Sequence, residues 1–477
     1  MRCAFWVVKA AIFRHDKGYI LLLQASPVHV TASYPQHFCA ILRLGLPLIG
    51  GHLAHFAIGL TDTIMMGWHS VAGLAALVLG STLFFVLFIM GSGFAGAIMP
   101  LVASAEAQGD QTQVRRITRM GFWLSALFGM LAVPVFWWSS TLLQAFGQQA
   151  SLADEAQRYL RFAGFAIVPA LLMMVVKSYL AGLEKTQAVL WIIVTGVGLN
   201  IVLNYAFIFG NWGAPELGIQ GAGVASLIVN FVLFFGVVLY AANTAPEYAL
   251  FHRLWKLDWD VFGAVARMGV PIGVTSLAES GLFAASAIMM GWLGTVPLAA
   301  HGIALQLTAA TFMVHLGLSN TATIRAGTAM GRQDQAHLLR GAWAVTAVAM
   351  AVVVVTVYVF LAYPHALIGL FLDAGEVNRD LILQTGTTLL AVAALFQLVD
   401  SGQVMALGLL RGVHDAGAPM VIAAVSYWMI GIPAAYYMGF VLHWQGPGIW
   451  LGLVVGLAVA AVLLMARFWL WSCRIKA

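Results

Sequence analysis

The sequence predicts an all-α integral membrane protein with twelve transmembrane helices in two six-helix lobes related by an internal repeat. Three observations lead to this prediction. Of the 477 residues, 62% are hydrophobic and only 9% are charged, and the mean hydropathy of +0.92 is too high for a soluble surface. Apolar runs of membrane-spanning length recur along the chain. A short motif in the first half also returns in the second half.

Apolar runs of about 20 residues, the length that crosses roughly 30 Å of hydrocarbon, are the candidate helices. Twelve runs begin near Leu46, Leu74, Phe122, Tyr159, Val189, Gly221, Phe262, Leu298, Ala342, Leu383, Pro419 and Ile449. Basic residues test this count, because cytoplasmic loops collect Lys and Arg. With loops on alternating sides, Arg158, Arg161 and Arg379 fall on one side and the other 23 − 3 = 20 basic residues on the other. Both termini are therefore predicted to be cytoplasmic.

The polar connections divide the chain into four parts. Residues 243–260 form the longest polar connection and are predicted to be a cytoplasmic linker between an N-terminal lobe at 44–242 and a C-terminal lobe with a short tail at 261–477. Residues 1–43 are predicted to be an N-terminal extension, because the apolar piece Met1–Ile12 is too short to span a membrane. A signal peptide is the less favoured alternative, since no small-residue cleavage site follows a clean apolar core. Another alternative is that the start codon is assigned too far upstream, so that part of the extension is not translated.

The two halves share a motif at a constant spacing. Ile64–Trp68 reads IMMGW, and the same letters return at Ile288–Trp292, which is 288 − 64 = 224 residues later. The same spacing pairs Gly93 with Gly317, Asp110 with Asp334, and Arg116 with Arg340. Six helices in each copy is an even number, so both copies keep the same orientation across the membrane. Parallel repeats of this kind place a cavity between two lobes.

Three carboxylates, Asp62, Glu279 and Asp400, lie well inside apolar runs of a chain that has only 18 acidic residues. A charged side chain near the bilayer centre costs about 2.5 to 3.5 kcal/mol even on lenient insertion scales, so it is normally kept for handling ions, protons or substrates. The 224-residue spacing pairs Glu279 with His55 and Asp62 with Ser286, so the repeat reproduces neither acid. The two lobes are therefore predicted to differ in chemistry.

Amide side chains near these acids are candidate cation or substrate ligands. Asn200 and Asn204 are four residues apart on one helical face, and Gln397 and Gln403 flank Asp400 at three residues on either side. Their oxygens suit Na⁺, a hard cation, whereas coupling to H⁺ needs only the acids. Hydrogen bonds between helices are the alternative role for the asparagines. Three histidines are predicted to pack in the interior, with a titrating role as the alternative: His55, His301 and His315.

At these residues the chain resembles the multidrug and toxic compound extrusion (MATE) family, of the NorM type. The motifs span about Leu44 to Arg467 and run in the same order in both lobes. They are GLTDTIMMG at Gly59–Gly67, the Asn200 and Asn204 pair, GAPELG at Gly213–Gly218, GAG at Gly221–Gly223, GVPIGVTSLAE at Gly269–Glu279, AHGIAL at Ala300–Leu305, LRG at Leu410–Gly412, and Asp415. The N-terminal extension departs from the family pattern.

The resemblance implies export of organic cations and amphipathic drugs, driven by inward movement of Na⁺ or H⁺. It implies that Glu279 and Asp400 match the cation-coupling acids of the C-terminal lobe. Asp62 matches the first-helix acid of the N-terminal lobe, with Asn200 and Asn204 as its polar partners. Alternating access between the lobes would then carry substrate across the membrane.

Other function classes fit less well. A lipid-linked precursor flippase of the same superfamily is the alternative, although its cavity should favour basic residues. No HExxH or GxSxG motif is present, so the sequence predicts no enzyme. The net charge of +5 follows from the positive-inside rule and predicts no nucleic-acid partner. Three cysteines, near the ends, predict neither disulfides nor a metal cluster. We expect no cofactor beyond the coupling ion, a monomer, and a multi-pass protein of a bacterial-type inner membrane.

Overall fold

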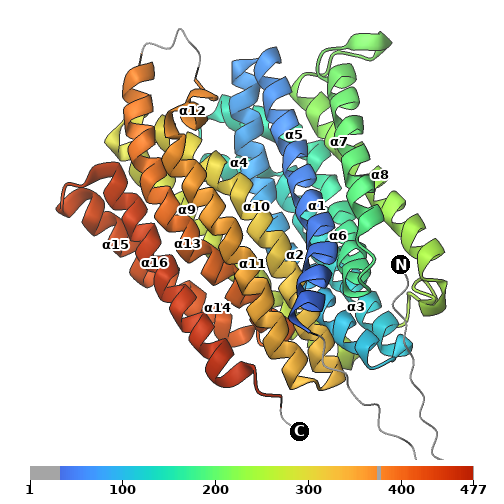
Figure 1. The fold of residues 1–477 in the computed structure, drawn as a ribbon. Coiled ribbons are helices and arrows are strands. Elements are labelled where there is room, and N and C mark those ends of the chain that lie inside the picture. The colour runs from blue at the N-terminus through green and yellow to red at the C-terminus, as the bar shows by residue number, and fades with distance from the viewer. Residues whose placement is uncertain (1–32, 373–377, 476–477) are drawn as a thin grey trace, which may run out of the picture.

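The computed structural model describes residues 33–372 and 378–475, which form long helices lying side by side (Figure 1). Within these described residues, twelve helices are long and apolar enough to cross a membrane. The predicted all-α membrane fold and its helix count are therefore confirmed. Residues 1–32, most of the predicted N-terminal extension, lie outside the described residues.

Both lobes are built from six membrane-length helices. Those of the first lobe are α1 (Tyr34–His69), α2 (Val71–Ala107), α3 (Gln111–Trp137), α5 (Ala150–Ala163) continued by α6 (Ile167–Gly182), α7 (Gln187–Phe207) and α8 (Ile219–Thr244). Those of the second are α9 (Trp259–Leu293), α10 (Thr295–Arg332), α11 (Gln335–Ala362), α13 (Arg379–Gly412), the helix from α14 (Gly417–Ala424) through α15 (Ile432–Tyr436) to Val441, and α16 (Gln445–Arg467). Two short helices complete the set, α4 (Ser139–Ala145) and α12 (Pro364–Gly369).

Each predicted helix start lies inside one of these helices, but the helices begin earlier than their apolar runs. Helix α1 shows why, because it begins at Tyr34 rather than near Leu46. Ser33 and Gln36 form a capping box at its first turn, and the Gln36 Oε1 accepts a hydrogen bond from the Ser33 N–H at 2.8 Å. Polar caps extend a helix beyond the hydrocarbon, so residues 34–43 of the predicted extension belong to α1.

The internal repeat is visible in the helix boundaries. Adding 224 to the bounds of α1, α2 and α3 gives 258–293, 295–331 and 335–361, which reproduces α9, α10 and α11 to within a residue. The repeated aspartates have the same local role. Asp110 accepts a hydrogen bond from the Gln113 N–H at 2.9 Å, and Asp334 accepts one from the His337 N–H at 2.8 Å. Both therefore cap the third helix of their lobe.

Both lobes contain buried cores, which continue across the lobe boundary at α9, and the outward faces are apolar as well. Trp450 and Tyr427 are among the largest fully buried side chains of the second lobe. On the outside, Trp191 and Trp471 are each more than 60% exposed. Exposed aromatic and aliphatic side chains of this kind suit contact with lipid, where backbone polar groups must be satisfied within the helices.

Glycines let the two lobes approach closely. A Cβ added at Gly93 of α2 would lie 2.3 Å from the Gly269 carbonyl oxygen and 2.4 Å from the Gly273 nitrogen, both on α9. At the equivalent position in the repeat, a Cβ on Gly317 of α10 would lie 2.5 Å from Cγ1 of Ile49 on α1. Two more glycines of α10 lie against the α2 backbone, Gly327 and Gly331. These contacts all occur in the helix halves nearest the α2–α3 and α10–α11 turns, the lower end in Figure 1.

Polar side chains join the lobes at the same end. The Arg325 Nη2 of α10 donates to Nδ1 of His37 on α1 at 2.7 Å and to Nε2 of His337 on α11 at 3.2 Å. Arg116 of α3 pairs with Asp258, the residue before α9, at 2.5 Å. This guanidinium holds the pKa of the Asp258 carboxyl below its usual range. The lobes are therefore closed against each other at one end of the bundle.

We predict that Gly93→Ala destabilises this closed end. The added methyl group would overlap the α9 backbone, which cannot move aside as a flexible side chain would, and overpacking of this kind costs about 1–3 kcal/mol. The thermal midpoint of the purified protein should fall by several degrees. The matched control is Gly263→Ala on α9, where an added Cβ has no atom within 4 Å. Equal midpoints for the two variants would contradict the close crossing.

Candidate functional site

The N-terminal lobe holds Asp62 in a cage of neutral donors. The Asp62 side chain on α1 is buried, and its Oδ1 accepts hydrogen bonds from Nδ2 of Asn200 at 2.9 Å and of Asn204 at 2.6 Å, both on α7. Its Oδ2 accepts one from the Ser226 hydroxyl of α8 at 3.2 Å. The four-residue spacing on α7 brings both asparagines to the same carboxylate, as the family resemblance implies. The Asn204 Oδ1 lies buried and has no hydrogen-bond partner among the described residues.

Asp400 in the C-terminal lobe is placed very differently. This residue of α13 is only 1% exposed, and neither carboxylate oxygen has a hydrogen-bond partner among the described residues. His315 of α10 is a titratable neighbour, and its Nδ1 lies 3.9 Å from the Asp400 Oδ2. His315 is itself completely buried. A buried carboxylate without direct donors is costly, so this site is suited to receive a cation or a proton.

Glu279 of α9 is close enough to Asp400 to interact with it electrostatically, and it completes the C-terminal cluster. The two carboxylates interact electrostatically, and the Arg411 guanidinium from the end of α13 is the basic group that acts on Glu279. The Gln403 side chain also contacts Glu279. The Glu279 Oε1 is buried and has no hydrogen-bond partner in the described part of the chain. Two carboxylates, those of Glu279 and Asp400, are therefore close to one guanidinium, that of Arg411.

The two glutamines that flank Asp400 donate hydrogen bonds to different neighbours. The Gln397 Nε2 donates to the Thr311 hydroxyl of α10 at 2.6 Å, and the Gln403 Nε2 donates to the Tyr427 hydroxyl at 2.6 Å. Their oxygens stay buried without a partner among the described residues. With the acids, they form a group of unpaired oxygens in the C-terminal lobe: Glu279 Oε1, Asp400 Oδ1 and Oδ2, Gln397 Oε1 and Gln403 Oε1.

The acids form two sites rather than one. Asp62 contacts side chains of α7 and α8 within its own lobe, whereas Glu279 and Asp400 lie together in the other. The structure adds residues that the sequence analysis did not place in these sites: Ser226, Tyr427, Arg411 and Thr311. His315, which the sequence analysis treats as a packing residue, lies next to Asp400. His301 instead accepts a hydrogen bond from the Trp450 Nε1 at 3.0 Å, which suits packing.

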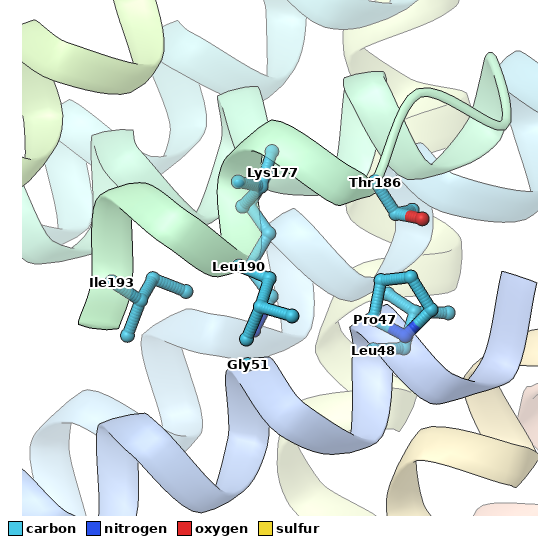
Figure 2. A pocket seen from close by; sticks show the side chains of 8 residues that line it. Pro47, Leu48, Gly51, Lys177, Thr186, Leu190 and Ile193 are labelled. Carbon is cyan, nitrogen blue, oxygen red and sulfur yellow. The ribbon is translucent and has the colours of Figure 1, made fainter. Parts of the chain in front are cut away.

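A small cavity near the closed end has a different character. Figure 2 shows Lys177 of α6 reaching between α1 and α7, toward Gly51. The rest of the lining is largely apolar: Pro47, Leu48, Thr186, Val189, Leu190 and Ile193. A basic, mostly apolar lining does not suit a cation, so this cavity is separate from the acid sites. Over residues 33–372 and 378–475, no group of three or more His, Cys, Asp or Glu side chains could hold a metal ion.

The comparison with protein families identifies the fold. The MatE family model matches residues 47–206 and again residues 271–437. The chain belongs to the MatE family. The two matched segments of this MatE protein begin 271 − 47 = 224 residues apart, which is the spacing of the internal repeat. The family places the chain among multi-pass membrane transporters of the multidrug efflux class, and it is not an enzyme.

Curated relatives match the MatE chain over nearly its whole length. It is 43% identical over 448 residues to the probable multidrug resistance protein NorM of Rhizobium meliloti, covering 93% of this chain and 96% of the relative. The corresponding NorM protein of Agrobacterium fabrum is 41% identical over 440 residues, covering 92% and 95%. The resemblance noted from the sequence motifs is therefore confirmed.

Solved structures share the fold at lower sequence identity. The eukaryotic MATE transporter AtDTX14 superposes with a TM-score of 0.82 at 17% identity, covering 92% of this chain and 96% of that one. A multidrug resistance MATE transporter of the MOP superfamily, solved in an outward-facing conformation, gives 0.82 at 19% identity and covers 93% and 97%. The MatE architecture is thus shared across distant sequences.

We predict that the Asn204–Asp62 hydrogen bond stabilises the fold chiefly through the charge of Asp62. Asn204→Ala removes the shortest donor to a buried carboxylate, which should cost about 1–3 kcal/mol and lower the thermal midpoint by several degrees. In an Asp62→Asn background the same substitution should cost less, and this double-mutant cycle isolates the pair. Equal costs of Asn204→Ala in both backgrounds would contradict the interaction. Asn211→Ala, in the short 3-10 helix Asn211–Gly213, is the control.

Proposed function

We propose that this MatE protein is a cation-coupled antiporter that exports organic cations and amphipathic drugs in exchange for Na⁺ or H⁺. The observation that carries the proposal is the pair of interacting carboxylates in the C-terminal lobe, Glu279 and Asp400: both Asp400 oxygens and the Glu279 Oε1 are buried without a hydrogen-bond partner among the described residues. An uncompensated negative charge in a low-dielectric interior attracts any cation that can reach it. The names of the NorM relatives support drugs as the class of cargo.

Competition for this charge provides the coupling. A proton or Na⁺ bound at Glu279 or Asp400 neutralises the carboxylate and weakens its attraction for a cationic drug. Na⁺ would use the unpaired oxygens of Gln397 and Gln403 as additional hard ligands, whereas H⁺ needs only the acids. His315 lies beside Asp400, with its Nδ1 3.9 Å from the Oδ2 of this acid.

Asp62 provides a second cation site in the N-terminal lobe. Its carboxylate is held by three neutral donors, and the unpaired Asn204 Oδ1 is available as a further oxygen ligand. Hydrogen bonds from neutral donors stabilise an ionised carboxylate without cancelling its charge. A cation that reaches Asp62 would therefore add to the driving force without competing directly at Glu279.

Alternating access between the lobes completes the proposed mechanism. The close glycine contacts between the lobes lie at the end that carries the α2–α3 and α10–α11 turns. The distribution of basic residues supports a cytoplasmic location for this end and for both termini, and the bacterial NorM relatives support an inner membrane. The observed arrangement is then the state open to the outside, from which drug leaves and coupling cation enters. Only a ligand with different affinities for the two states can drive the exchange.

We predict that Glu279→Gln and Asp400→Asn each lower coupled export at least tenfold while the protein stays folded. Each change keeps the size of the side chain and removes the charge for which drug and cation compete. Transport of ethidium is measured in proteoliposomes under a Na⁺ gradient and, separately, under a pH gradient. Glu216→Gln, at an exposed glutamate, is the control.

The two gradients distinguish the coupling ions and test the proposal itself. Transport driven by Na⁺ alone assigns the unpaired oxygens to sodium, and transport driven by the pH gradient alone makes the acids proton carriers. Wild-type rates in both acid variants would contradict the proposed coupling site. Absence of wild-type transport under either gradient would favour the lipid-linked precursor flippase instead.

A further inference from the structure

The eleventh membrane helix is irregular at the level of the C-terminal acids. Two stretches of π-helix, Val425–Gly431 and Tyr437–Val441, interrupt it on either side of α15. A π-turn has a wider repeat than an α-turn, and such turns occur frequently at functional sites. The counterpart in the N-terminal lobe, α7, is a regular α-helix throughout. The irregularity is therefore particular to the lobe that contains Glu279 and Asp400.

Tyr427, in the first π-helical stretch, reaches Glu279 through a glutamine. The tyrosine side chain is fully buried, and its hydroxyl accepts a hydrogen bond from the Gln403 Nε2 at 2.6 Å. Gln403 in turn contacts Glu279. The charged groups whose fields reach the Tyr427 hydroxyl are Glu279 of α9 and Asp400 and Arg411 of α13. Tyr427 thus fixes the orientation of the amide that lies between the helix and the acid.

Trp428, the next residue, reaches the backbone of α9 beside the same acid. Its Nε1 donates to the Ala278 carbonyl oxygen at 3.1 Å, directly before Glu279 in the chain. Its indole ring lies over Gly281, where an added Cβ would come within 2.6 Å of the ring carbon Cζ2. The absence of a side chain at Gly281 therefore makes room for the indole.

The repeat gives this arrangement a counterpart. In the N-terminal lobe, α7 supplies Asn200 and Asn204 directly to the acid of α1. In the C-terminal lobe, the corresponding helix donates no hydrogen bond to Glu279 among the described residues. It instead contacts the Gln403 side chain and the Ala278 carbonyl oxygen through hydrogen bonds. In the N-terminal lobe, the fifth helix thus contacts the acid of the first helix directly. In the C-terminal lobe, the equivalent helix contacts the groups that lie next to Glu279.

We propose that Tyr427 and Trp428 are positioning residues that set the placement of Glu279 relative to Asp400, and thereby the cation affinity of the C-terminal site. The proposal rests on the proposed function, in which these acids bind the coupling cation. Tyr427 acts through Gln403, and Trp428 acts through the α9 backbone. Neither side chain needs to touch the cation or the drug.

The first test is Tyr427→Phe, which removes the hydroxyl and keeps the ring in the core. The Gln403 amide loses its partner and becomes free to rotate, so the cation concentration for half-maximal ethidium export should rise about fivefold, which is the effect of losing one ordinary hydrogen bond. The maximal rate and the thermal midpoint should stay close to wild type. Tyr437→Phe, at a half-exposed tyrosine of the second π-helical stretch, is the control.

The second test addresses the contact between Trp428 and α9. Trp428→Phe removes the indole N–H, and Gly281→Ala pushes the ring away from the helix, so both should shift the half-saturating cation concentration in the same direction as Tyr427→Phe. Gly263→Ala on the same helix meets no neighbouring atom and should leave that concentration unchanged. A structural defect alone would lower the thermal midpoint and leave the cation dependence unchanged.

Glu279→Gln separates failure of this inference from failure of the proposed function. If Glu279→Gln abolishes coupled export while Tyr427→Phe and Gly281→Ala keep the wild-type cation dependence, the positioning role is overturned and the coupling site stands. If Glu279→Gln transports at the wild-type rate, the proposed function itself fails. Loss of export by Tyr427→Phe at every cation concentration, with an unchanged midpoint, would also overturn the assignment, because it would make Tyr427 a direct member of the site.

Discussion

The structure depends on the cost of keeping a carboxylate inside a low-dielectric interior. An ionised acid there must be given donors, given a cation, or neutralised by a proton. The N-terminal lobe uses the first solution, because Asn200, Asn204 and Ser226 all donate to Asp62. The C-terminal lobe leaves Asp400 without hydrogen-bond donors in the described part of the chain, which makes a cation or a proton the remaining solution. The two lobes thus surround a carboxylate differently, with hydrogen-bond donors around Asp62 and without them around Asp400.

Close packing of the lobes at one end of the bundle determines the side from which the acids can be reached. Gly93, Gly317 and their neighbours bring helix backbones together at one end of the bundle, where Arg325 and Arg116 add polar links across the lobes. The acids lie beyond those contacts along their helices, Glu279 and Asp400 near the middle of α9 and α13 and Asp62 closer to the far end of α1. A molecule in which the lobes rock about such a contact can expose the acids to one side at a time. Glycine contacts suit this movement, since flat backbones can separate without disentangling side chains.

Sequence alone predicts much of this arrangement. The twelve helices follow from apolar runs, and the repeat follows from the IMMGW motif at Ile64 and Ile288. The meeting of Asn200 and Asn204 with Asp62 follows from helical spacing, once the family resemblance places the helices together. The proximity of His315 to Asp400 does not follow, because it depends on the crossing of two helices distant in sequence. Nor do the π-helical turns, since the residues around Tyr427 have no local signal that separates a π-turn from an α-turn.

The most direct test of the account is competition between drug and cation on the purified protein. Ethidium binding is measured by fluorescence at equilibrium, in detergent, while Na⁺ concentration and pH are varied separately. The account predicts that one of these cations displaces ethidium, that ethidium weakens binding of that cation by the same factor, and that Asp400→Asn abolishes the mutual effect. Simultaneous binding of ethidium and cation, with no influence of either on the other, would contradict the claim that they compete for the same carboxylates.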